Sequence, residues 1–115
     1  MRETPQTLFH IIKQAVPTSA DFLSGAQRGQ TKPRDPDRER YWHGFSAFNT
    51  LDGARNQAQR FRKLGEFIVE IAVAGVVGVQ YEQSFGPGHY TVWAEPDTCV
   101  RNVIRVYPVW DREEE

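Results

Sequence analysis

Hydrophobic and polar residues alternate with a period of two in several short segments, which is the pattern of β-strands. The clearest segment is 44–48, which places Phe45 and Ala47 on one face of a strand. Segment 66–74 is mostly apolar on both faces, and this favours a strand at the centre of a sheet. Four further strands are expected at 8–12, 77–83, 89–93 and 100–109.

Two other segments repeat apolar residues at the spacing of an α-helix. The first is a short helix that begins near Thr18, a residue type that caps free amides, and ends at Gly25 or Gly29. The residues that follow, 29–40, hold no apolar side chain except prolines, so they cannot contribute to a core. We expect a long surface loop there, with a helical turn that starts near residues 35–36.

The second helix is longer and is expected to span 51–64, with Thr50 as its cap and Gly65 at its end. A further helical turn is expected at 96–97. The buried stripe of the longer helix consists of five apolar residues: Leu51, Ala54, Ala58, Phe61 and Leu64. Six strands and two main helices, both in the first half of the chain, predict an α+β fold with one mostly antiparallel sheet.

A chain of 115 residues has the length of one domain. We assign that domain to residues 1–110, and the charged residues 111–115 to an acidic tail of net charge −3. The longest apolar stretch, 67–79, contains Glu70 and two glycines and is shorter than the roughly 20 apolar residues of a membrane span. We therefore expect no membrane partner. Because the N-terminus shows no export signal, we expect a cytoplasmic protein.

Positive charge is concentrated in one part of the chain. Residues 25–63 hold nine Lys or Arg against four Asp or Glu, so this segment has a net charge of +5, although the whole chain has −1. Nucleic-acid-binding domains usually show a basic surface in the isoelectric point of the whole chain, which is about 6.3 here. We therefore do not expect nucleic acid as a partner.

No metal site is expected. The three histidines, His10, His43 and His89, and the single cysteine, Cys99, are not spaced like zinc ligands, which usually include two residues roughly two to five positions apart. A single cysteine also excludes an internal disulfide. We expect Cys99 to be a small buried residue.

Three residues in separate predicted strands carry a resemblance to a known family: His10 in the first, Ser46 in the second and Glu82 in a later one. In this order they resemble the ADP-ribosyltransferase superfamily, whose small domains carry a His or Arg on the first strand, a Ser or Tyr on a second and a catalytic Glu on a later one. The chain also resembles a group of short, uncharacterised bacterial proteins in three stretches: 17–24, 42–46 and 88–93.

The superfamily resemblance implies an enzyme that binds NAD and transfers ADP-ribose. Glu82 would stabilise the positive charge that develops on the ribose when its bond to nicotinamide breaks. Ser46 would position the nicotinamide ribose, and His10 would hydrogen-bond the adenosine ribose or a phosphate.

The resemblance also implies contacts for the rest of the ligand. The diphosphate would be bound by a basic residue of the long loop region: Arg28, Lys32 or Arg34. The nicotinamide ring would pack on an aromatic side chain: Phe48, Tyr90 or Trp93. The coarser form of the same hypothesis is a domain that binds a nucleotide-like ligand.

The same residues also have an ordinary structural interpretation. His10 would be a half-buried histidine, Ser46 an ordinary strand residue and Glu82 an exposed residue at the end of a strand, because such residues are common on the solvent-exposed face of a sheet. Tyr90 and Trp93 would belong to the core. An enzyme, in contrast, needs a concave polar cleft in which His10, Ser46 and Glu82 converge.

The alternative function is a non-catalytic interaction module, such as an immunity or antitoxin-like partner of another protein. Aromatic residues are common in protein interfaces. The candidate interface consists of three consecutive ring side chains, Tyr41, Trp42 and His43, together with Trp93.

Overall fold

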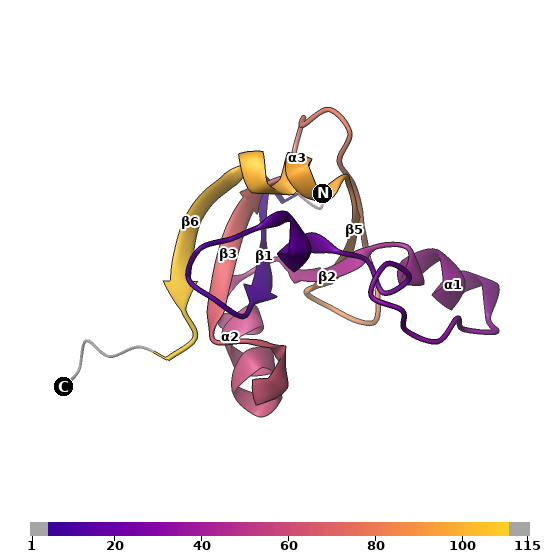
Figure 1. Cartoon of the computed structure of the whole chain (residues 1–115), viewed down its shortest axis with the longest axis horizontal. Helices are drawn as coiled ribbons and strands as arrows, with labels where there is room; N and C mark the ends of the chain where they lie inside the picture. Colours follow the sequence, from indigo (N-terminus) through magenta and orange to yellow (C-terminus); the bar gives the residue numbers. More distant parts are fainter. Residues whose placement is uncertain (1–4, 111–115) are drawn as a thin grey trace.

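Six strands form one sheet in the structure, a computed structural model that describes residues 5–110. The strands are β1 (Thr7–Ile12), β2 (Phe45–Phe48), β3 (Phe67–Ala72), β4 (Gln80–Gln83), β5 (His89–Trp93) and β6 (Val103–Pro108). Their order across the sheet is β4-β5-β2-β1-β3-β6, and neighbouring strands are antiparallel. The predicted α+β fold with one antiparallel sheet is confirmed (Figure 1). The predicted acidic tail, 111–115, lies outside the described residues.

The helical elements of the described chain are short. They are η1 (Ser19–Phe22), α1 (Pro36–Trp42), α2 (Leu51–Arg60), η2 (Arg62–Leu64) and α3 (Pro96–Arg101), of which η1 and η2 are 3-10 turns. Asp35 caps α1 and Thr50 caps α2, because each side chain accepts a hydrogen bond from a free amide of the first turn. Within residues 5–110, no helix has the length and apolar character that crossing a bilayer requires.

One face of the sheet, called here the η1 face, carries the larger core. Leu8, Phe45 and Val69 from three strands pack there with Phe22 of η1 and Cys99 of α3. These side chains occupy alternate strand positions, as the period of two in the sequence predicts. The η1 face is therefore closed by two short elements that are far apart in sequence.

The opposite face, called here the α2 face, is covered in part by α2. Ala54 and Ala58 of this helix are buried against Ile68 and Val109. The two alanines let the helix backbone approach the sheet closely. α2 contacts β1, β2 and β3, so the part of this face formed by β4 and β5 lies beyond the helix.

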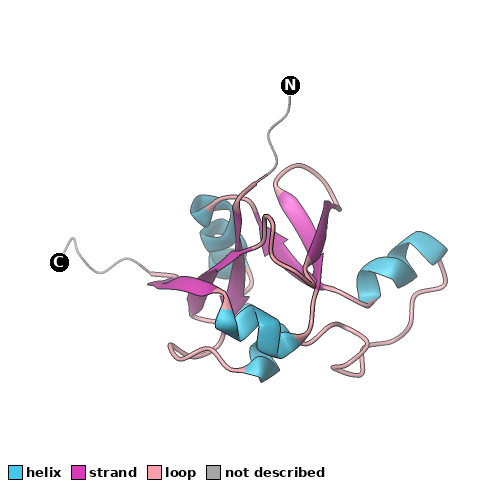
Figure 2. Cartoon of the chain, turned by 90° about the horizontal axis from the view of Figure 1, so that it is seen from above, coloured by secondary structure: helices cyan, strands magenta, loops and turns pink. Residues whose placement is uncertain are grey.

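The helix α1 lies beside the end of the sheet that β4 and β5 form, and it projects away from the rest of the molecule (Figures 1 and 2). None of its seven residues is buried. Its position therefore depends on polar and aromatic contacts rather than on a core.

The sheet has a narrow seam between β1 and β2. β1 pairs with β3 along its whole length, from Thr7 to Ile12, whereas it pairs with β2 at Phe9 and Phe48 alone. Beyond that pair the two strands separate. The seam is the place where the candidate site lies.

Two helix predictions are wrong in extent. The helix predicted from Thr18 is only the turn η1, because Leu23, which follows it, is already extended, with φ −75° and ψ 146°. The longer helix ends at Arg60 rather than at residue 64, because Phe61 leaves the helical conformation, with φ −128° and ψ 81°.

The predicted buried stripe of the longer helix therefore fails at its C-terminal end. Ala54 and Ala58 are buried as predicted, but Phe61 is 49% exposed and Leu64 is 40% exposed. The predicted helical turn at 96–97 is confirmed as α3, which continues to Arg101. Helical structure is thus not confined to the first half of the chain.

Candidate functional site

Three neighbouring cavities share the side chain of Arg28. The η1 cavity, about 350 Å³, lies between the end of β1 and η1 and includes His10 and Lys13. The α1 cavity, about 290 Å³, lies between β2 and the segment before α1 and includes Arg38. The seam cavity, about 160 Å³, lies where β1 and β2 separate and includes His10 and Ser46. We call the three together the Arg28 groove.

Arg28 is positioned by a turn rather than by a helix or strand. The Ser24 hydroxyl accepts the Gln27 amide at 3.0 Å, and the Gln27 side chain accepts the Ser24 amide at 2.9 Å. The Ala26 amide then donates to the Trp42 carbonyl at 2.9 Å, which attaches this turn to the end of α1. The side chain of Arg28 makes no hydrogen bond or ion pair with another described residue, so its guanidinium is available to a ligand.

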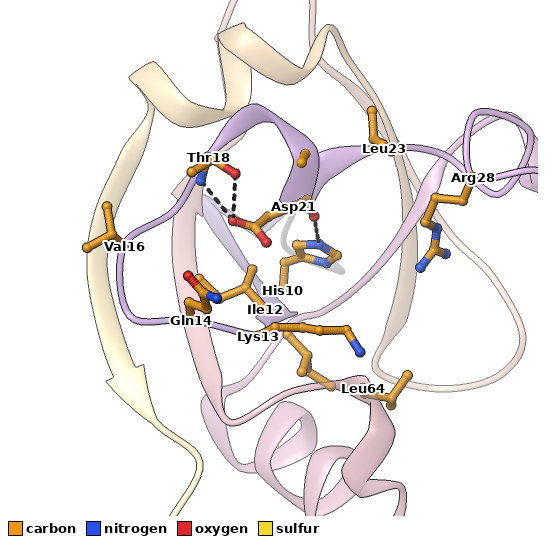
Figure 3. A pocket seen from close by; sticks show the side chains of 12 residues that line it. His10, Ile12, Lys13, Gln14, Val16, Thr18, Asp21, Leu23, Arg28 and Leu64 are labelled. Atoms are coloured by element: carbon orange, nitrogen blue, oxygen red, sulfur yellow. Dashed lines mark hydrogen bonds between the residues drawn. The ribbon is translucent and has the colours of Figure 1, made fainter.

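The η1 cavity is cationic on one side. Figure 3 shows Lys13 and Arg28 directed toward the same space beside His10. The Lys13 ammonium also donates to the Lys63 carbonyl at 2.7 Å. The one carboxylate that lines this cavity, Asp21, is already bound to the Thr18 amide.

His10 is held by two backbone carbonyls. Its Nδ1 lies 2.7 Å from the Ser46 oxygen and its Nε2 lies 2.6 Å from the Asp21 oxygen. The ring also packs against Phe22 and Phe45, with centroids 5.3 and 4.6 Å away. Burial lowers the pKa of His10 and outweighs the two carbonyls, which favour the protonated ring. Both ring nitrogens thus face carbonyl oxygens within the protein, and His10 supports the groove rather than directing a nitrogen into it.

The α1 cavity combines positive charge with aromatic rings. Arg28 and Arg38 line it, none of its lining residues is acidic, and Arg38 makes no ion pair with another described residue. Its aromatic lining residues are Tyr41, Trp42, Phe45 and Phe85. A site of this composition is suited to an anion that carries a planar ring.

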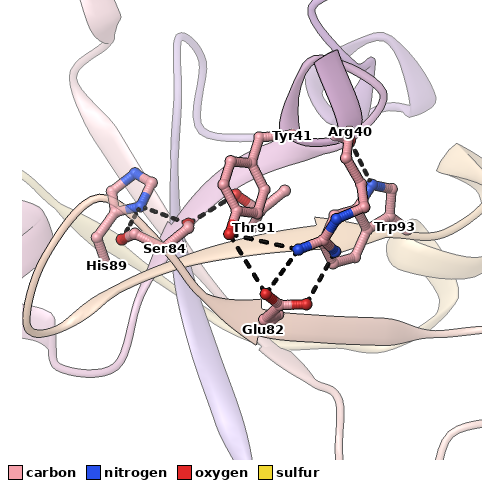
Figure 4. A network of polar contacts seen from close by, with 7 residues as sticks. All are labelled: Arg40, Tyr41, Glu82, Ser84, His89, Thr91 and Trp93. Atoms are coloured by element: carbon pink, nitrogen blue, oxygen red, sulfur yellow. Dashed lines mark hydrogen bonds and ion pairs between the residues drawn. The ribbon is translucent and has the colours of Figure 1, made fainter. Parts of the chain in front are cut away.

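Glu82 lies outside the Arg28 groove, in a cluster with Arg40, Tyr41 and Trp93 (Figure 4). The guanidinium of Arg40 donates to both Glu82 oxygens, at 2.8 and 2.7 Å, and the Tyr41 hydroxyl lies 3.3 Å from one of them. Arg40 also lies over the rings of Tyr41 and Trp93, 4.9 and 5.3 Å from their centroids. The bonds from Arg40 lower the pKa of Glu82.

The strand register explains which predicted site residues come together. Ser46 and Glu82 are both paired with Thr91, so the three lie in one row on the same face of the sheet with Thr91 between them. His10 packs against Phe45, which is on the opposite face. His10 and Ser46 meet only because the strands separate at the seam, and Glu82 does not join them.

The other predicted ligand contacts are distributed differently. Phe48 lines the seam cavity. Tyr90 is half-buried and packs on the η1 face, which agrees with the interpretation of this residue as core. Lys32 forms an ion pair with Glu39 at 3.4 Å, and Arg34 lines none of the three cavities.

The candidate aromatic interface is largely engaged within the molecule. The Trp42 indole donates to the Gln30 carbonyl and the Trp93 indole donates to the Arg40 carbonyl, both at 3.0 Å. Tyr41 packs against Phe85 with centroids 5.0 Å apart. These side chains hold the segment before α1 and α1 itself against the sheet.

Sequence reasoning missed Arg38, Phe85 and His89 as site residues. Phe85 has a positive φ of 54°, which is uncommon for a non-glycine residue and is found preferentially at functional sites. The signal for a special turn was present in the glycines and proline that follow Phe85 in the sequence. Nothing in the sequence pattern indicated that this turn would lie beside α1.

Within residues 5–110, no three His, Cys, Asp or Glu side chains gather as metal ligands would. Cys99 is buried, and burial raises the pKa of its thiol to about 11, so the thiol stays protonated at neutral pH.

No protein-family model, curated protein sequence or solved structure matches this chain.

Proposed function

We propose that this protein binds a nucleotide-like, phosphate-bearing small molecule in the Arg28 groove. The observation that supports this is the position of Arg28, which lines all three cavities and whose side chain makes no hydrogen bond or ion pair with another described residue. A guanidinium with free N–H groups matches a phosphate, which accepts two parallel hydrogen bonds from it. We assign the phosphate to Arg28, with Arg38 as its second cation.

The remaining walls fit the rest of such a ligand. Tyr41 and Phe85 offer aromatic surface in the α1 cavity, and planar bases commonly pack on such rings. Ser46 lines both the α1 and the seam cavity, and its hydroxyl can donate to or accept from a ribose hydroxyl. Charge, ring surface and hydroxyl are thus present along one groove.

The test is calorimetric titration with ADP and NAD, and with adenosine, which lacks the phosphates. We expect ADP and NAD to bind and adenosine to bind more weakly. Arg28→Gln should weaken ADP binding roughly 10- to 100-fold, as the loss of a hydrogen bond to a charged group commonly does. Arg34→Gln is the matched control, because Arg34 is a nearby arginine of the segment before α1 and lines none of the cavities.

Two results would contradict the proposal. One is equal affinity for ADP and adenosine, since the phosphate would then contribute nothing. The other is equal weakening by Arg28→Gln and Arg34→Gln, since general positive charge would then explain binding. Absence of any binding at millimolar ADP and NAD would leave the interaction-module hypothesis, with a protein partner, as the one to pursue.

A narrower form of the proposal is an NAD-consuming, ADP-ribosyl-transferring reaction with Glu82 as the residue that stabilises the ribosyl cation. Glu82 lies in the same cross-strand row as Ser46, but its carboxylate is bound to Arg40. This reaction requires the ligand to reach the ion pair or the pair to separate. Glu82→Gln should then lower nicotinamide release from NAD by about 100-fold or more while NAD affinity changes little.

A further inference from the structure

His89 has a defined arrangement of hydrogen bonds at the start of β5. Its Nδ1 lies 3.1 Å from the backbone oxygen of Ser84 and 3.1 Å from the Ser84 hydroxyl oxygen. The Ser84 hydroxyl lies 2.7 Å from the hydroxyl of Thr91. Figure 4 shows the other ring nitrogen, Nε2, on the side of the ring that faces away from Ser84.

These contacts determine which nitrogen carries the proton. A carbonyl oxygen can only accept a hydrogen bond, so Nδ1 must donate to Ser84. In a neutral imidazole the other nitrogen is then unprotonated and accepts. Burial lowers the pKa of His89, which keeps the ring neutral at neutral pH. The Nε2 of His89 is therefore an acceptor, and it makes no hydrogen bond with another described residue.

His89 lines the seam cavity, where its surroundings are suited to a flat ring. Phe48 meets the His89 ring edge to face, with centroids 5.2 Å apart and planes at 89°. Ile11 and Leu64 add apolar wall, and the side chain of Gln57 adds an amide. The volume of about 160 Å³ is close to that of an engineered protein cavity, about 150 Å³, that holds one benzene molecule.

We infer that the seam cavity binds one six-membered heterocyclic ring, and that an N–H group of this ring or of its amide substituent donates to Nε2 of His89. The inference rests on the proposed function, because it takes the ring to be the base of the nucleotide-like ligand. Arg28 lines the seam cavity as well as the other two, so a phosphate on Arg28 and a ring beside His89 can belong to one molecule. His89 then selects bases that donate at this position.

The first test uses free rings without phosphate: uracil and nicotinamide, each against an analogue whose N–H groups are methylated. We expect millimolar binding of at least one unmethylated ring and roughly tenfold weaker binding of its methylated analogue, as expected for the loss of one hydrogen bond to a half-buried acceptor. Ring-nitrogen NMR should show a protonated Nδ1 and an unprotonated Nε2 in His89. The Nε2 resonance should shift when the ring binds.

The second test uses variants of His89. His89→Phe removes the acceptor but keeps a planar ring, and should weaken ring binding about tenfold. His89→Gln places an amide oxygen near the position of Nε2 and should restore part of the affinity. His43→Phe is the matched control, since His43 is exposed and lines none of the three cavities. Thermal unfolding of each variant verifies that it is folded.

The outcomes separate this inference from the proposed function. If Arg28→Gln weakens ADP binding but His89→Phe changes neither ring nor nucleotide binding, the inference fails and the proposed function stands. If a free ring binds with the expected dependence on His89 but no phosphate-bearing ligand binds, the proposed function fails and the ring site stands. A proton on Nε2 in the free protein, or binding of neither ring, overturns the inference directly.

Discussion

At the scale of single residues, the surroundings of His10 restrict the protonation state of its ring. A neutral ring has one N–H group, yet both ring nitrogens of His10 face carbonyl oxygens. The neutral ring therefore satisfies one of the two carbonyls, whereas the protonated ring would satisfy both at the cost of a buried charge. Because burial is the larger effect on the pKa of His10, the neutral ring is favoured.

This arrangement predicts how stability depends on pH. Burial lowers the pKa of both His10 and His89 below 6.5, so near and below that pH the unfolded chain binds protons that the folded protein does not. Stability should therefore rise with pH through this window and fall as the pH is lowered through about 6.5, with each histidine contributing a slope of at most about 1.4 kcal/mol per pH unit. Urea denaturation at a series of pH values measures the slope.

Variants assign the slope to the two histidines. His10→Gln and His89→Gln should each reduce the pH dependence of the free energy of unfolding below about pH 6.5. The control is His43→Gln, which replaces an exposed histidine that lines none of the three cavities. Stability that increases as the pH falls through this window would mean that the two carbonyls, rather than burial, dominate at His10.

At the scale of elements, α1 stands out because it buries no residue and is still held in place. It is attached by the ion pair between Arg40 and Glu82 and by the Trp93 indole, which donates to the Arg40 carbonyl. The segment before α1 forms one wall of the α1 cavity. Since exposed ion pairs contribute little to stability, this wall is the part of the site that opens most easily.

Glu82→Gln therefore has an expected effect on proteolysis. The substitution removes the negative charge that holds Arg40. It should therefore speed tryptic cleavage within 28–40, a region that contains four arginines and one lysine, without lowering the global unfolding temperature. Glu95→Gln is the control, because Glu95 is also exposed and makes no side-chain cap of α3. Faster cleavage inside α2 than within 28–40 would show that α1 is not the least stable element.

At the scale of the whole molecule, stability is concentrated in the sheet and its two covered faces. Ile68 is fully buried under α2, whereas Phe61, at the end of the same helix, is 49% exposed. Leu8 and Ile12 are fully buried on the η1 face. The end of α2 therefore contributes little to the core, although its sequence reads as a continuation of the buried stripe.

Two substitutions should show this difference. Ile68→Ala should lower the free energy of unfolding by about 2 to 5 kcal/mol, the usual effect of such a truncation in a core. Phe61→Ala should lower it by less than about 1 kcal/mol, because the ring already contacts water. Chemical denaturation of both variants measures this. A larger effect of Phe61→Ala than of Ile68→Ala would mean that the end of α2 is docked in solution.

The sequence was sufficient to predict where the strands lie but not which residues come together in the candidate site. Alternation at Phe45 and Ala47, and apolar residues on both faces around Val69, reported burial directly, so the strands were located to within a few residues. The turn η1 and the helix α2 end because Leu23 and Phe61 leave the helical conformation, and the spacing of apolar residues does not show where that happens. The order of His10 and Ser46 along the chain suggested that the two lie close together. That Glu82 lies apart from them depends on the strand register and on its ion pair with Arg40.

The strand order also has a consequence for how the chain is made. β1 is synthesised before β3, which is its main partner. The pairing between β1 and β3, from Thr7 with Ala72 to Ile12 with Phe67, can therefore form only after Ala72 has been added to the chain. Such long-range pairing folds slowly, because the chain must lose loop entropy before contacts form. The Arg28 groove needs His89 and Thr91 of β5 as well, and so comes into existence only when that strand has joined β2. A nascent chain that stops short of β5 has the arginine but not the groove.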